Sequence, residues 1–313
     1  MTTVAVTPRG FRETPGPHRD LLASSGIDVR YATKERPLSA DELSELLEGC
    51  TGVILGVDDA SEPVLRAATD LTTIVRFGIG TDNVDLAVAN ELGIRVSRTL
   101  GATTTSVAEL TLGLMLTAAR SITMMDRAVR AGSWSRLSGI ELAGRTLGLV
   151  GTGRIGRDVA VRARAFGMTV IGHDPLADAS DIPLVSLEEL LARSDVISIH
   201  APYTPETHHL VDAAFLAAMR PGSLLVNSAR GGIVDEAALA QALAWGPLAA
   251  AALDSFEQEP LPDDSPLRGV PNVVLTPHCG AATVDAIVRA GVLAVEELMR
   301  GLANQPMLYD VTG

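Results

Sequence analysis

The sequence is poor in several features that mark whole classes of protein. Aromatic residues make up 3% of its 313 residues although 47% are hydrophobic, so Ala, Val, Leu and Ile must build most of the core. The two cysteines, Cys50 and Cys279, show no paired spacing, which favours a reducing compartment over a disulfide framework. No apolar run reaches the roughly 18 residues that a membrane span requires.

The amino-terminal region also lacks a basic segment followed by an apolar core. No signal peptide is therefore predicted, and we expect a cytoplasmic protein. The formal net charge of −13 argues against nucleic acid or an anionic membrane surface as a partner. Because the acids form no long block, they are interpreted as a solvated surface. The chain length predicts two domains.

The most informative stretch runs from Leu147 to Asp174. An apolar run leads into the turn Gly151-Thr-Gly-Arg-Ile-Gly156, and a stretch with helical periodicity follows. Gly167 ends that predicted helix, and a second apolar run at 168–172 precedes Asp174. The order strand, glycine turn, helix, strand and acid is typical of a dinucleotide-binding βαβ unit.

Each part of this turn has a predicted task. Gly151 allows a tight turn, Gly153 lets the backbone approach a pyrophosphate, and Gly156 lets the helix pack on the strand. The helix N-terminus offers free N–H groups and the positive end of its dipole to phosphates. A glycine turn by itself is also compatible with a purely structural role. The surrounding strands and the acid at the expected distance favour the dinucleotide site.

Asp174 is expected to accept hydrogen bonds from the adenosine ribose and to repel a 2′-phosphate. Pro175 and Leu176 follow it, and neither can attract that phosphate. The sequence therefore favours NAD(H) over NADP(H). In the predicted helix, Ile155, Val159, Ala163 and Phe166 are spaced to face one side.

Strand-like and helical stretches alternate along the chain, which predicts two doubly wound parallel sheets with helices on their faces. Strands are expected at 3–6, 29–32, 52–57 and 74–77 in a first unit, and at 147–150, 168–172, 195–200, 223–227, 248–254 and 273–276 in a second. Helices are expected at 39–49, with a capping box formed by Ser39 and Glu42, and at 61–69, 186–194, 212–219 and 235–246.

The connection between the two units is distinctive. A mostly apolar helix is predicted from Ser106, as its cap, to Arg120, and an extended arm that contains Trp134 and lies outside the core follows it. The last amphipathic stretch is 283–301. Its return to the first unit would make that domain discontinuous.

Every strand of the second unit ends in a polar or special residue. These ends are Asp174, His200-Ala-Pro202, Asn227 to Gly232, Asp254, and Pro277 to Gly280. Each has an ordinary alternative when taken singly: Arg230 as a turn cap, Glu259 as a solvated loop acid, and His278 as a surface histidine. Because ligands of such sheets gather at the carboxyl ends of the strands, their coincidence there predicts a functional site.

Six stretches of the chain resemble the D-isomer-specific 2-hydroxyacid dehydrogenase family, which includes D-3-phosphoglycerate dehydrogenase. They are RFGIGTDNVD (76–85), TTSVAELTLGLML (104–116), GRTLGLVGTGRIGRDVA (144–160), VNSARGGIVDEAAL (226–239), ALDSFEQEPLP (252–262) and NVVLTPHCGAAT (272–283). The resemblance implies a Rossmann NAD-binding domain of residues 100–284 inserted into a flavodoxin-like substrate domain of residues 1–99 and 285–313. It also implies a homodimer, held through the helix and arm of residues 106–145.

The resemblance further assigns catalysis to Arg230, Glu259 and His278. An imidazole titrates near neutrality and suits a general acid, a carboxylate beside it fixes the ring, and a guanidinium binds a carboxylate through a planar fork. The implied cofactor contacts are Thr105, Gly151, Gly153, Arg154, Ile155, Gly156, Asp174, His200, Ala201, Pro202, Ser228, Ala229, Arg230, Asp254, His278 and Gly280. The implied substrate contacts are Arg76, Gly78, Ile79, Gly80, Arg230 and His278, and no metal is expected.

The expected activity is reversible hydride transfer between NADH and the C2 carbonyl of a 2-oxo acid. The family's phosphoglycerate branch carries a basic residue where this chain has Gly56, and two acids, Asp58 and Asp59, follow it. This departure weakens the case for 3-phosphoglycerate and leaves the substrate open. Alternatives are a dehydrogenase of the same fold for formate or phosphite, and an NAD(H)-sensing corepressor-like protein. A methyltransferase that used the same turn would have no need for Arg230, Glu259 and His278 together.

Overall fold

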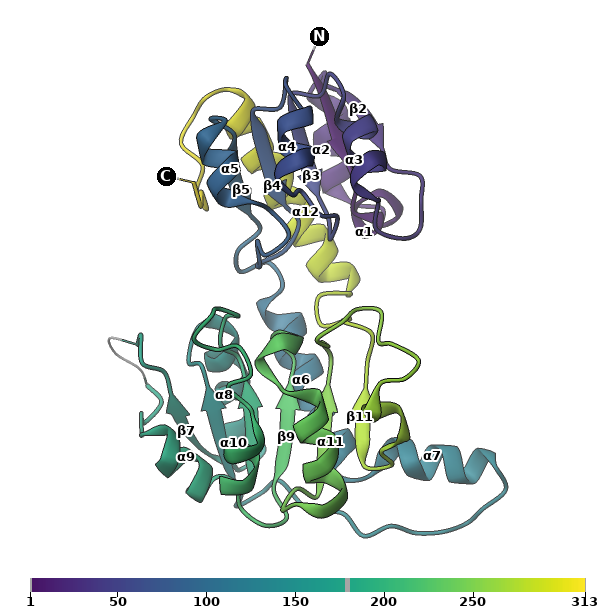
Figure 1. The fold of residues 1–313 in the computed structure, drawn as a ribbon, viewed down its shortest axis with the longest axis vertical. Coiled ribbons are helices and arrows are strands. Elements are labelled where there is room, and N and C mark those ends of the chain that lie inside the picture. The colour runs from purple at the N-terminus through teal and green to yellow at the C-terminus, as the bar shows by residue number, and fades with distance from the viewer. Residues whose placement is uncertain (1, 178–180, 313) are drawn as a thin grey trace. The chain divides into compact units, whose positions relative to one another are not determined.

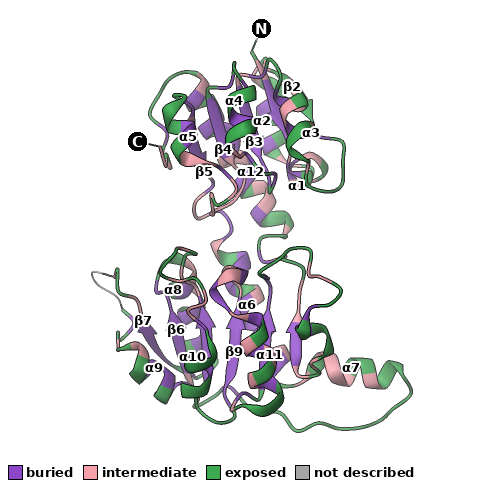
Figure 2. Ribbon diagram, viewed as in Figure 1, coloured by how far each residue is buried: buried purple, intermediate pink, exposed green. Residues whose placement is uncertain are grey.

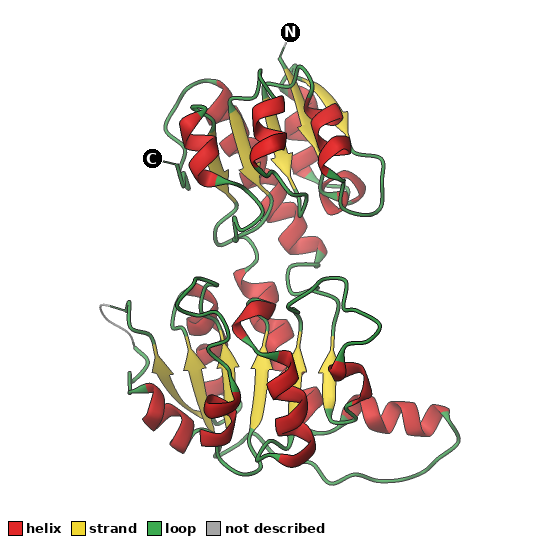
Figure 3. Cartoon of the chain, viewed as in Figure 1, coloured by secondary structure: helices red, strands yellow, loops and turns green. Residues whose placement is uncertain are grey.

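The computed structural model describes residues 2–177 and 181–312. The chain divides into two compact units, one formed by residues 1–103 and 281–313 and the other by residues 104–280. The boundaries lie within a few residues of those expected from the family. Each unit is a parallel sheet with helices on both faces (Figure 3).

The first unit contains a five-stranded parallel sheet of order β2-β1-β3-β4-β5. Its strands are β1 (Thr3–Val6), β2 (Asp28–Tyr31), β3 (Gly52–Leu55), β4 (Thr73–Arg76) and β5 (Arg95–Arg98). Its helices are α1 (Arg9–Glu13), α2 (Pro17–Ser24), α3 (Ala40–Leu47), α4 (Glu62–Ala67), α5 (Leu86–Glu91) and α12 (Val284–Leu302). The order 2-1-3-4-5 is that of flavodoxin-like folds, which confirms the expected fold class.

Alternate strand residues face opposite layers in this unit. In β3, Val53 and Leu55 join the cluster under α3, α4 and α5, whereas Ile54 joins the cluster under α1, α2 and α12. Helix α12, which follows the last strand of this sheet by almost 200 residues, thus completes the helical layer on one of its faces (Figure 1). The expected capping box of α3 is present, because Ser39 accepts from the Glu42 N–H and Glu42 accepts from the Ser39 N–H.

The second unit contains a six-stranded parallel sheet of order β11-β10-β9-β8-β6-β7. Its strands are β6 (Thr146–Val150), β7 (Thr169–His173), β8 (Val196–Ile199), β9 (Leu224–Asn227), β10 (Ala250–Leu253) and β11 (Val273–Leu275). Its helices are α6 (Thr104–Ala119), α7 (Ile122–Arg130), α8 (Arg154–Ala165), α9 (Leu187–Arg193), α10 (Ala213–Ala218) and α11 (Glu236–Trp245), with short 3-10 turns η1 (Gly231–Ile233) and η2 (Pro266–Gly269).

Here too the two faces of the sheet have separate cores. Helices α6 and α8 cover one face, and α9, α10 and α11 cover the other. Strands β8, β9 and β10 are buried along their whole length (Figure 2), as expected of the centre of a sheet covered on both faces. The strand order reverses between β6 and β8, and this reversal places the ligand-binding crevice at their carboxyl ends.

Three expectations about local structure were wrong. Helix α6 begins at Thr104, so Ser106 lies buried inside its first turns and does not cap it. Phe166 follows the last residue of α8 and is exposed, because the helix ends before the ring can turn toward the core. The chain after α6 is not extended from its start but first forms a further helix, α7, although α7 buries none of its residues and so lies outside the core as expected.

Several short elements had no expected counterpart. They are α1, α2, α5, β5 and the two 3-10 turns. Each spans eight residues or fewer, which is shorter than the window of about 11 to 18 residues in which a hydrophobic period is read. Among the described residues, no single helix is long and apolar enough to cross a membrane, and α6 with α7 meets that description only as a pair bent by 64°.

Candidate active site

The glycine turn between β6 and α8 has the geometry that its sequence predicts. Gly151 adopts φ +94°, and a Cβ there would lie 2.7 Å from the backbone of His200 and Ala201. A Cβ on Gly156 would lie 2.4 Å from the carbonyl oxygen of Gly151, so only glycine lets α8 start this close to the turn. Nothing lies within 4 Å of the Cβ position of Gly153. The space in front of that residue therefore fits the approach of a pyrophosphate to the N-terminus of α8.

Asp174 follows β7 and is held by its neighbours. Its Oδ2 accepts hydrogen bonds from the backbone N–H of Thr152, at 2.8 Å, and from the hydroxyl of Thr152, at 3.1 Å. Its Oδ1 accepts from the N–H of Leu176 at 3.1 Å. Burial acts to raise the pKa of Asp174, but these hydrogen bonds outweigh burial and the pKa lies below its usual range. The carboxylate thus stays ionised beside the glycine turn.

His200 follows β8 and meets this turn from the other side. Its backbone N–H donates to the carbonyl of Val150 at 2.7 Å, and its Nε2 lies 2.9 Å from the hydroxyl of Ser198. Burial lowers the pKa of His200 to about 4, although part of the residue remains exposed. The ring is therefore neutral at physiological pH. Ala201 and Pro202 continue the same loop beside Gly151.

The loop after β9 presents Arg230. Asn227, fully buried, donates from its amide to the carbonyl of Arg230 at 2.9 Å and accepts from the N–H of Ala229 at 3.0 Å. A Cβ on the next residue, Gly231, would lie 1.8 Å from the backbone carbon of Phe256. The Arg230 loop therefore rests directly on the backbone of the loop after β10, which carries Glu259. Ser228, in the same loop, is 2.7 Å from the hydroxyl of Thr111 in α6.

Glu259 and His278 form the central contact of the site. Oε2 of Glu259 lies 2.8 Å from Nδ1 of His278, and Oε1 of Glu259 accepts from the N–H of Phe256 at 3.0 Å. Burial acts to raise the pKa of Glu259, but His278, the Phe256 N–H and the charge of Arg230 lower it below its usual range. The carboxylate thus fixes one ring nitrogen and directs Nε2 away from itself. Part of His278 is exposed, so a small molecule can reach the ring.

Asp254 holds the loop on which His278 stands. Its Oδ1 accepts from the hydroxyl of Thr276 at 2.6 Å and from the N–H of Cys279 at 2.9 Å, and its Oδ2 accepts from the N–H of Gly280 at 2.8 Å. The residue is only 2% exposed. The structure thus gives Asp254 a loop-holding task that the sequence did not reveal. His278 itself has φ +49°, a conformation that this anchored loop maintains.

The expected substrate residues of the first unit surround the end of β4. Gly78 adopts φ +155°, and the guanidinium of Arg76 lies over it, 2.1 Å from the position of a Cβ. The carbonyl of Gly78 accepts from the N–H of Thr99 at 3.0 Å, and that of Ile79 accepts from Arg98 at 3.3 Å. The positive φ and the guanidinium over this position both favour glycine at position 78 of the loop that continues to Gly80.

Gly56 lies at the end of the neighbouring strand β3. Its N–H donates to the hydroxyl of Thr7 at 2.7 Å, and this hydroxyl in turn donates to the carboxylate of Asp58. A Cβ on Gly56 would lie 3.3 Å from Oδ2 of Asp58, which is 4% exposed. The carboxylate of Asp58 thus occupies space beside Gly56.

The structure thus joins the predicted residues in groups. Glu259 contacts His278 directly and feels the charge of Arg230, and Asp174, the glycine turn and His200 form a second group in the same unit. Arg154 and Thr105 are exposed in the first turns of α8 and α6. Gly280 is buried against Val107 of α6. Arg76 and Gly78 to Gly80 belong to the first unit.

Some residues of the site were missed from the sequence. Thr152 holds Asp174, Asn227 shapes the Arg230 loop, and Gly231 sets the spacing of two loops. Thr152 lies inside the glycine turn, where its position was a usable signal. Asn227 bonds to Ala229 and Arg230 within its own loop, but its residue type alone does not show this. Gly231 meets Phe256 in the loop after the next strand, which no local pattern could reveal.

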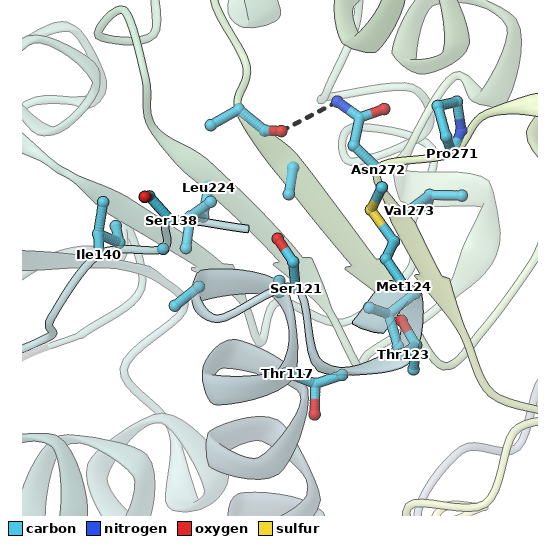
Figure 4. Close-up of a pocket in the computed structure, with 16 residues that line it drawn as sticks. Thr117, Ser121, Thr123, Met124, Ser138, Ile140, Leu224, Pro271, Asn272 and Val273 are labelled. Atoms are coloured by element: carbon cyan, nitrogen blue, oxygen red, sulfur yellow. Dashed lines mark hydrogen bonds between the residues drawn. The ribbon is translucent and has the colours of Figure 1, made fainter. Parts of the chain in front are cut away.

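A cavity of about 160 Å³ lies elsewhere in the second unit (Figure 4). It is lined by the amino ends of β9, β10 and β11 and by the joint between α6 and α7, and Asn272 donates there to the carbonyl of Ala249 at 2.9 Å. None of the predicted site residues lines it. It belongs to the edge of the sheet opposite the ligand-binding edge, so we assign it no catalytic part. Within the described residues, no group of three His, Cys, Asp or Glu side chains is arranged to hold a metal ion.

Known proteins with similar sequences have names that fit this site. Residues 112–280 match the family described as "D-isomer specific 2-hydroxyacid dehydrogenase, NAD binding domain". The chain is 42% identical over 277 residues to D-3-phosphoglycerate dehydrogenase of Methanocaldococcus jannaschii, which covers 86% of this chain and 53% of that protein. It is also 42% identical over 272 residues to hydroxypyruvate reductase of Thermotoga maritima, covering 85% and 89% respectively.

The chain thus spans about half the length of that phosphoglycerate dehydrogenase and most of that reductase. A Thermus thermophilus protein of known crystal structure superposes with a TM-score of 0.91 at 40% identity, covering 99% of this chain and 100% of the other. The family match extends over more than half of the chain. The fold, the NAD-binding turn and these similarities together show that the chain belongs to the D-isomer-specific 2-hydroxyacid dehydrogenase family.

Proposed function

We propose that this protein is an NAD-dependent D-2-hydroxyacid dehydrogenase that interconverts a small 2-oxo acid and its D-2-hydroxy acid. The observation that carries this proposal is the 2.8 Å contact between Glu259 and Nδ1 of His278, beside the loop of Arg230. When bound, the dinucleotide supplies a hydride to C2 of the substrate or accepts one from it. The remaining chemistry is proton transfer and charge stabilisation, for which these side chains are suited.

In this proposal His278 gives a proton from Nε2 to the carbonyl oxygen during reduction and takes it back during oxidation. Glu259 keeps the ring in one orientation and stabilises the charged imidazolium, because its carboxylate is held at both oxygens. Arg230 binds the substrate carboxylate and the carbonyl oxygen as it gains negative charge. The backbone of Gly78 to Gly80 would add N–H groups for that carboxylate.

The cofactor contacts are assigned to the edge of the second sheet. The turn from Gly151 to Gly156 would bind the pyrophosphate, and Asp174 would bind the adenosine ribose. Ala201, Pro202 and Ser228 would lie beside the dinucleotide. Asp254 and Gly280 carry the loop near which the nicotinamide would lie. The ionised carboxylate of Asp174 supports NAD(H) over NADP(H), since a 2′-phosphate would face a second negative charge.

The first unit supports a substrate without a phosphate. Asp58, almost fully buried, lies beside Gly56 and would repel a phosphoryl group that approached this end of β3. We therefore place unphosphorylated 2-oxo acids ahead of 3-phosphohydroxypyruvate.

We further propose that the protein is a homodimer that uses α7 and the following arm. Helix α7 is amphipathic yet buries none of its residues. Trp134 in the arm is 78% exposed. An isolated large apolar side chain is ordinary, but an exposed helix and arm with several apolar residues are typical of an interface.

The direct test measures NADH oxidation with a panel of 2-oxo acids. The panel contains glyoxylate, pyruvate, hydroxypyruvate, 3-phosphohydroxypyruvate, and branched and aromatic 2-oxo acids. We expect stereospecific reduction of at least one unphosphorylated acid to the D-product. Oxidation of formate or phosphite, or NADH binding without any turnover, would instead support the alternative functions of this fold.

The His278→Ala variant tests the proposed acid. It should lose at least about 10²-fold in turnover, because proton transfer then lacks a positioned donor. NADH affinity, measured by fluorescence titration, should survive, since the glycine turn is untouched. Unchanged turnover would remove His278 from the mechanism.

A further inference from the structure

Two glutamates outside the trio bind each other's backbone. The N–H of Glu236 donates to Oε1 of Glu257 at 2.9 Å, and the N–H of Glu257 donates to Oε1 of Glu236 at 2.7 Å. Glu236 is the first residue of α11, and Glu257 stands in the loop after β10. The exchange resembles a capping box whose two members come from separate segments.

This contact satisfies the start of α11. Asp235 caps the helix by accepting from the N–H of Ala238, and Glu257 accepts the N–H of Glu236, one of the other amides without an acceptor within the helix. Glu236 in turn accepts one hydrogen bond from the N–H of Glu257 in the loop. About nine-tenths of the surface of Glu236 is buried. Such a buried acceptor cannot be exchanged for water without cost, so the loop is fixed to the helix.

The same loop holds the catalytic pair. The N–H of Phe256, directly before Glu257, donates to Glu259, whose other oxygen contacts His278. Burial raises the pKa of Glu236, and the charges of Glu257 and Glu259 raise it further, so these carboxyl groups interact. Nε2 of His209 lies 3.4 Å from Oε1 of Glu257.

We propose that Glu236 is a positioning residue for the Glu259–His278 pair. By accepting the N–H of Glu257, it fixes the loop after β10 on the first turn of α11. Phe256 and Glu259 are thereby kept where Glu259 meets Nδ1 of His278. The role belongs to the acceptor oxygen and its reach, and not to the charge of Glu236. This inference rests on the proposed function, because that function makes the His278 contact catalytic.

Three substitutions at one position separate reach from charge. Glu236→Gln keeps an acceptor oxygen at the same reach and removes the charge. Glu236→Asp keeps the charge and withdraws the oxygen by one methylene, and Glu236→Ala removes both. Glu188→Ala is the matched control, because Glu188 is an exposed first-turn glutamate of α9 in the same unit.

We expect kcat/KM for the best 2-oxo acid to fall about tenfold or more in the Asp and Ala variants, because the pair is displaced. The Gln variant and the control should stay within about threefold of wild type. The alkaline limb of the pH profile for reduction should move to lower pH in the Asp and Ala variants only, since the imidazolium loses its carboxylate partner. NADH affinity should be unchanged in all four.

A second readout does not depend on turnover. The hydrogen-bonded Nδ1 proton of His278, identified by its loss in His278→Ala, should give a sharp NMR signal in wild type and Glu236→Gln. It should broaden in Glu236→Asp and Glu236→Ala. If wild type reduced no 2-oxo acid while this pattern held, the proposed function would fail and the positioning role would stand.

Two results would overturn the inference. One is a Gln variant as impaired as the Ala variant. The other is a loss of thermal stability in the Asp and Ala variants with the pH limb and the Nδ1 signal unchanged, which would show a merely structural residue. If Glu236→Ala does not fold, the comparison of the Asp and Gln variants still decides the outcome.

Discussion

Asp174 shows how a single residue combines two tasks. Its carboxylate accepts hydrogen bonds from the backbone N–H and the hydroxyl of Thr152. These hydrogen bonds tie the glycine turn to the end of β7. The same hydrogen bonds keep its pKa low, so its negative charge persists at the ribose end of the predicted cofactor site. The local structure and the proposed cofactor preference therefore depend on the same oxygen atoms.

The Asp174→Ala variant should narrow the preference for NADH over NADPH. Removing the charge removes the repulsion of a 2′-phosphate, and we expect the ratio of kcat/KM values to fall about tenfold or more. The ratio is measured with both cofactors at a saturating 2-oxo acid concentration. Asp41→Ala, an exposed first-turn acid of α3, is the control. An unchanged ratio in Asp174→Ala would contradict the role.

His200 makes stability depend on pH. Its folded-state pKa of about 4 lies below the ordinary 6.5, so between these values the unfolded chain binds a proton that the folded chain does not. The stabilisation is fully present above about pH 6.5 and is lost as the pH falls toward 4, by up to about 1.4 kcal/mol per pH unit.

Urea unfolding of wild type and His200→Gln between pH 7 and pH 5 measures this effect. The free energy of unfolding of wild type should fall with pH, and the slope should be smaller in the variant. Equal slopes in the two proteins would show that another group causes the pH dependence.

At the scale of elements, the site depends on how loops after different strands pack together. Gly231 lets the loop after β9 rest on the backbone of Phe256, and this contact brings Arg230 beside the loop that carries Glu259. Backbone cannot move aside as a flexible side chain can. The spacing of the two loops is therefore set by the absence of a single Cβ.

The Gly231→Ala variant should lose about 3 kcal/mol or more of the free energy of unfolding, because its Cβ would overlap the neighbouring backbone. Turnover should fall with it, since Arg230 and Glu259 are forced apart. Gly269→Ala is the matched control, because nothing lies within 4 Å of its Cβ position. Thermal unfolding and kcat/KM are measured for both, and a stable, active Gly231→Ala protein would disprove this packing argument.

At the scale of the whole molecule, α7 and the arm after it expose an unusual amount of apolar surface for one unit. Figure 1 shows α7 and the segment after it extending beyond the sheet of that unit. Ile122, Val129, Trp134 and Leu137 all expose large apolar side chains there. A second copy of the chain is the occupant that we propose for this surface.

Sedimentation velocity should therefore show a particle of two 32.7 kDa chains. Replacing Trp134 and Leu137 together by Asp should produce monomers, since buried aromatic anchors contribute much of the affinity of an interface. Trp245→Asp is the control, because Trp245 is 92% exposed but lies at the end of α11. A monomeric wild type, or a dimer that survives the double substitution, would refute the arm interface.

The sequence determined the features that depend on local order. Alternating apolar runs specified the strands and helices of the two parallel sheets, and the spacing of Gly151, Gly153, Gly156 and Asp174 specified the dinucleotide turn, because each strand, helix and turn is a local feature of the chain. The family motifs added Arg230, Glu259 and His278. The sequence pattern predicted the wrong first residue for α6 and a buried side for Phe166, because packing and the positions of helix ends determine both.

Only the tertiary structure revealed the contacts between segments far apart in the chain. Asp254 holds the His278 loop, Gly231 sets the distance between two loops, and Glu236 exchanges hydrogen bonds with Glu257. In sequence these are an acid, a glycine and a first-turn glutamate with ordinary local roles. Their partners lie 21 or more residues away and become neighbours only because parallel strands end at one edge of a sheet. The physical reason is that a hydrogen bond depends on distance in space, which local sequence spacing does not fix.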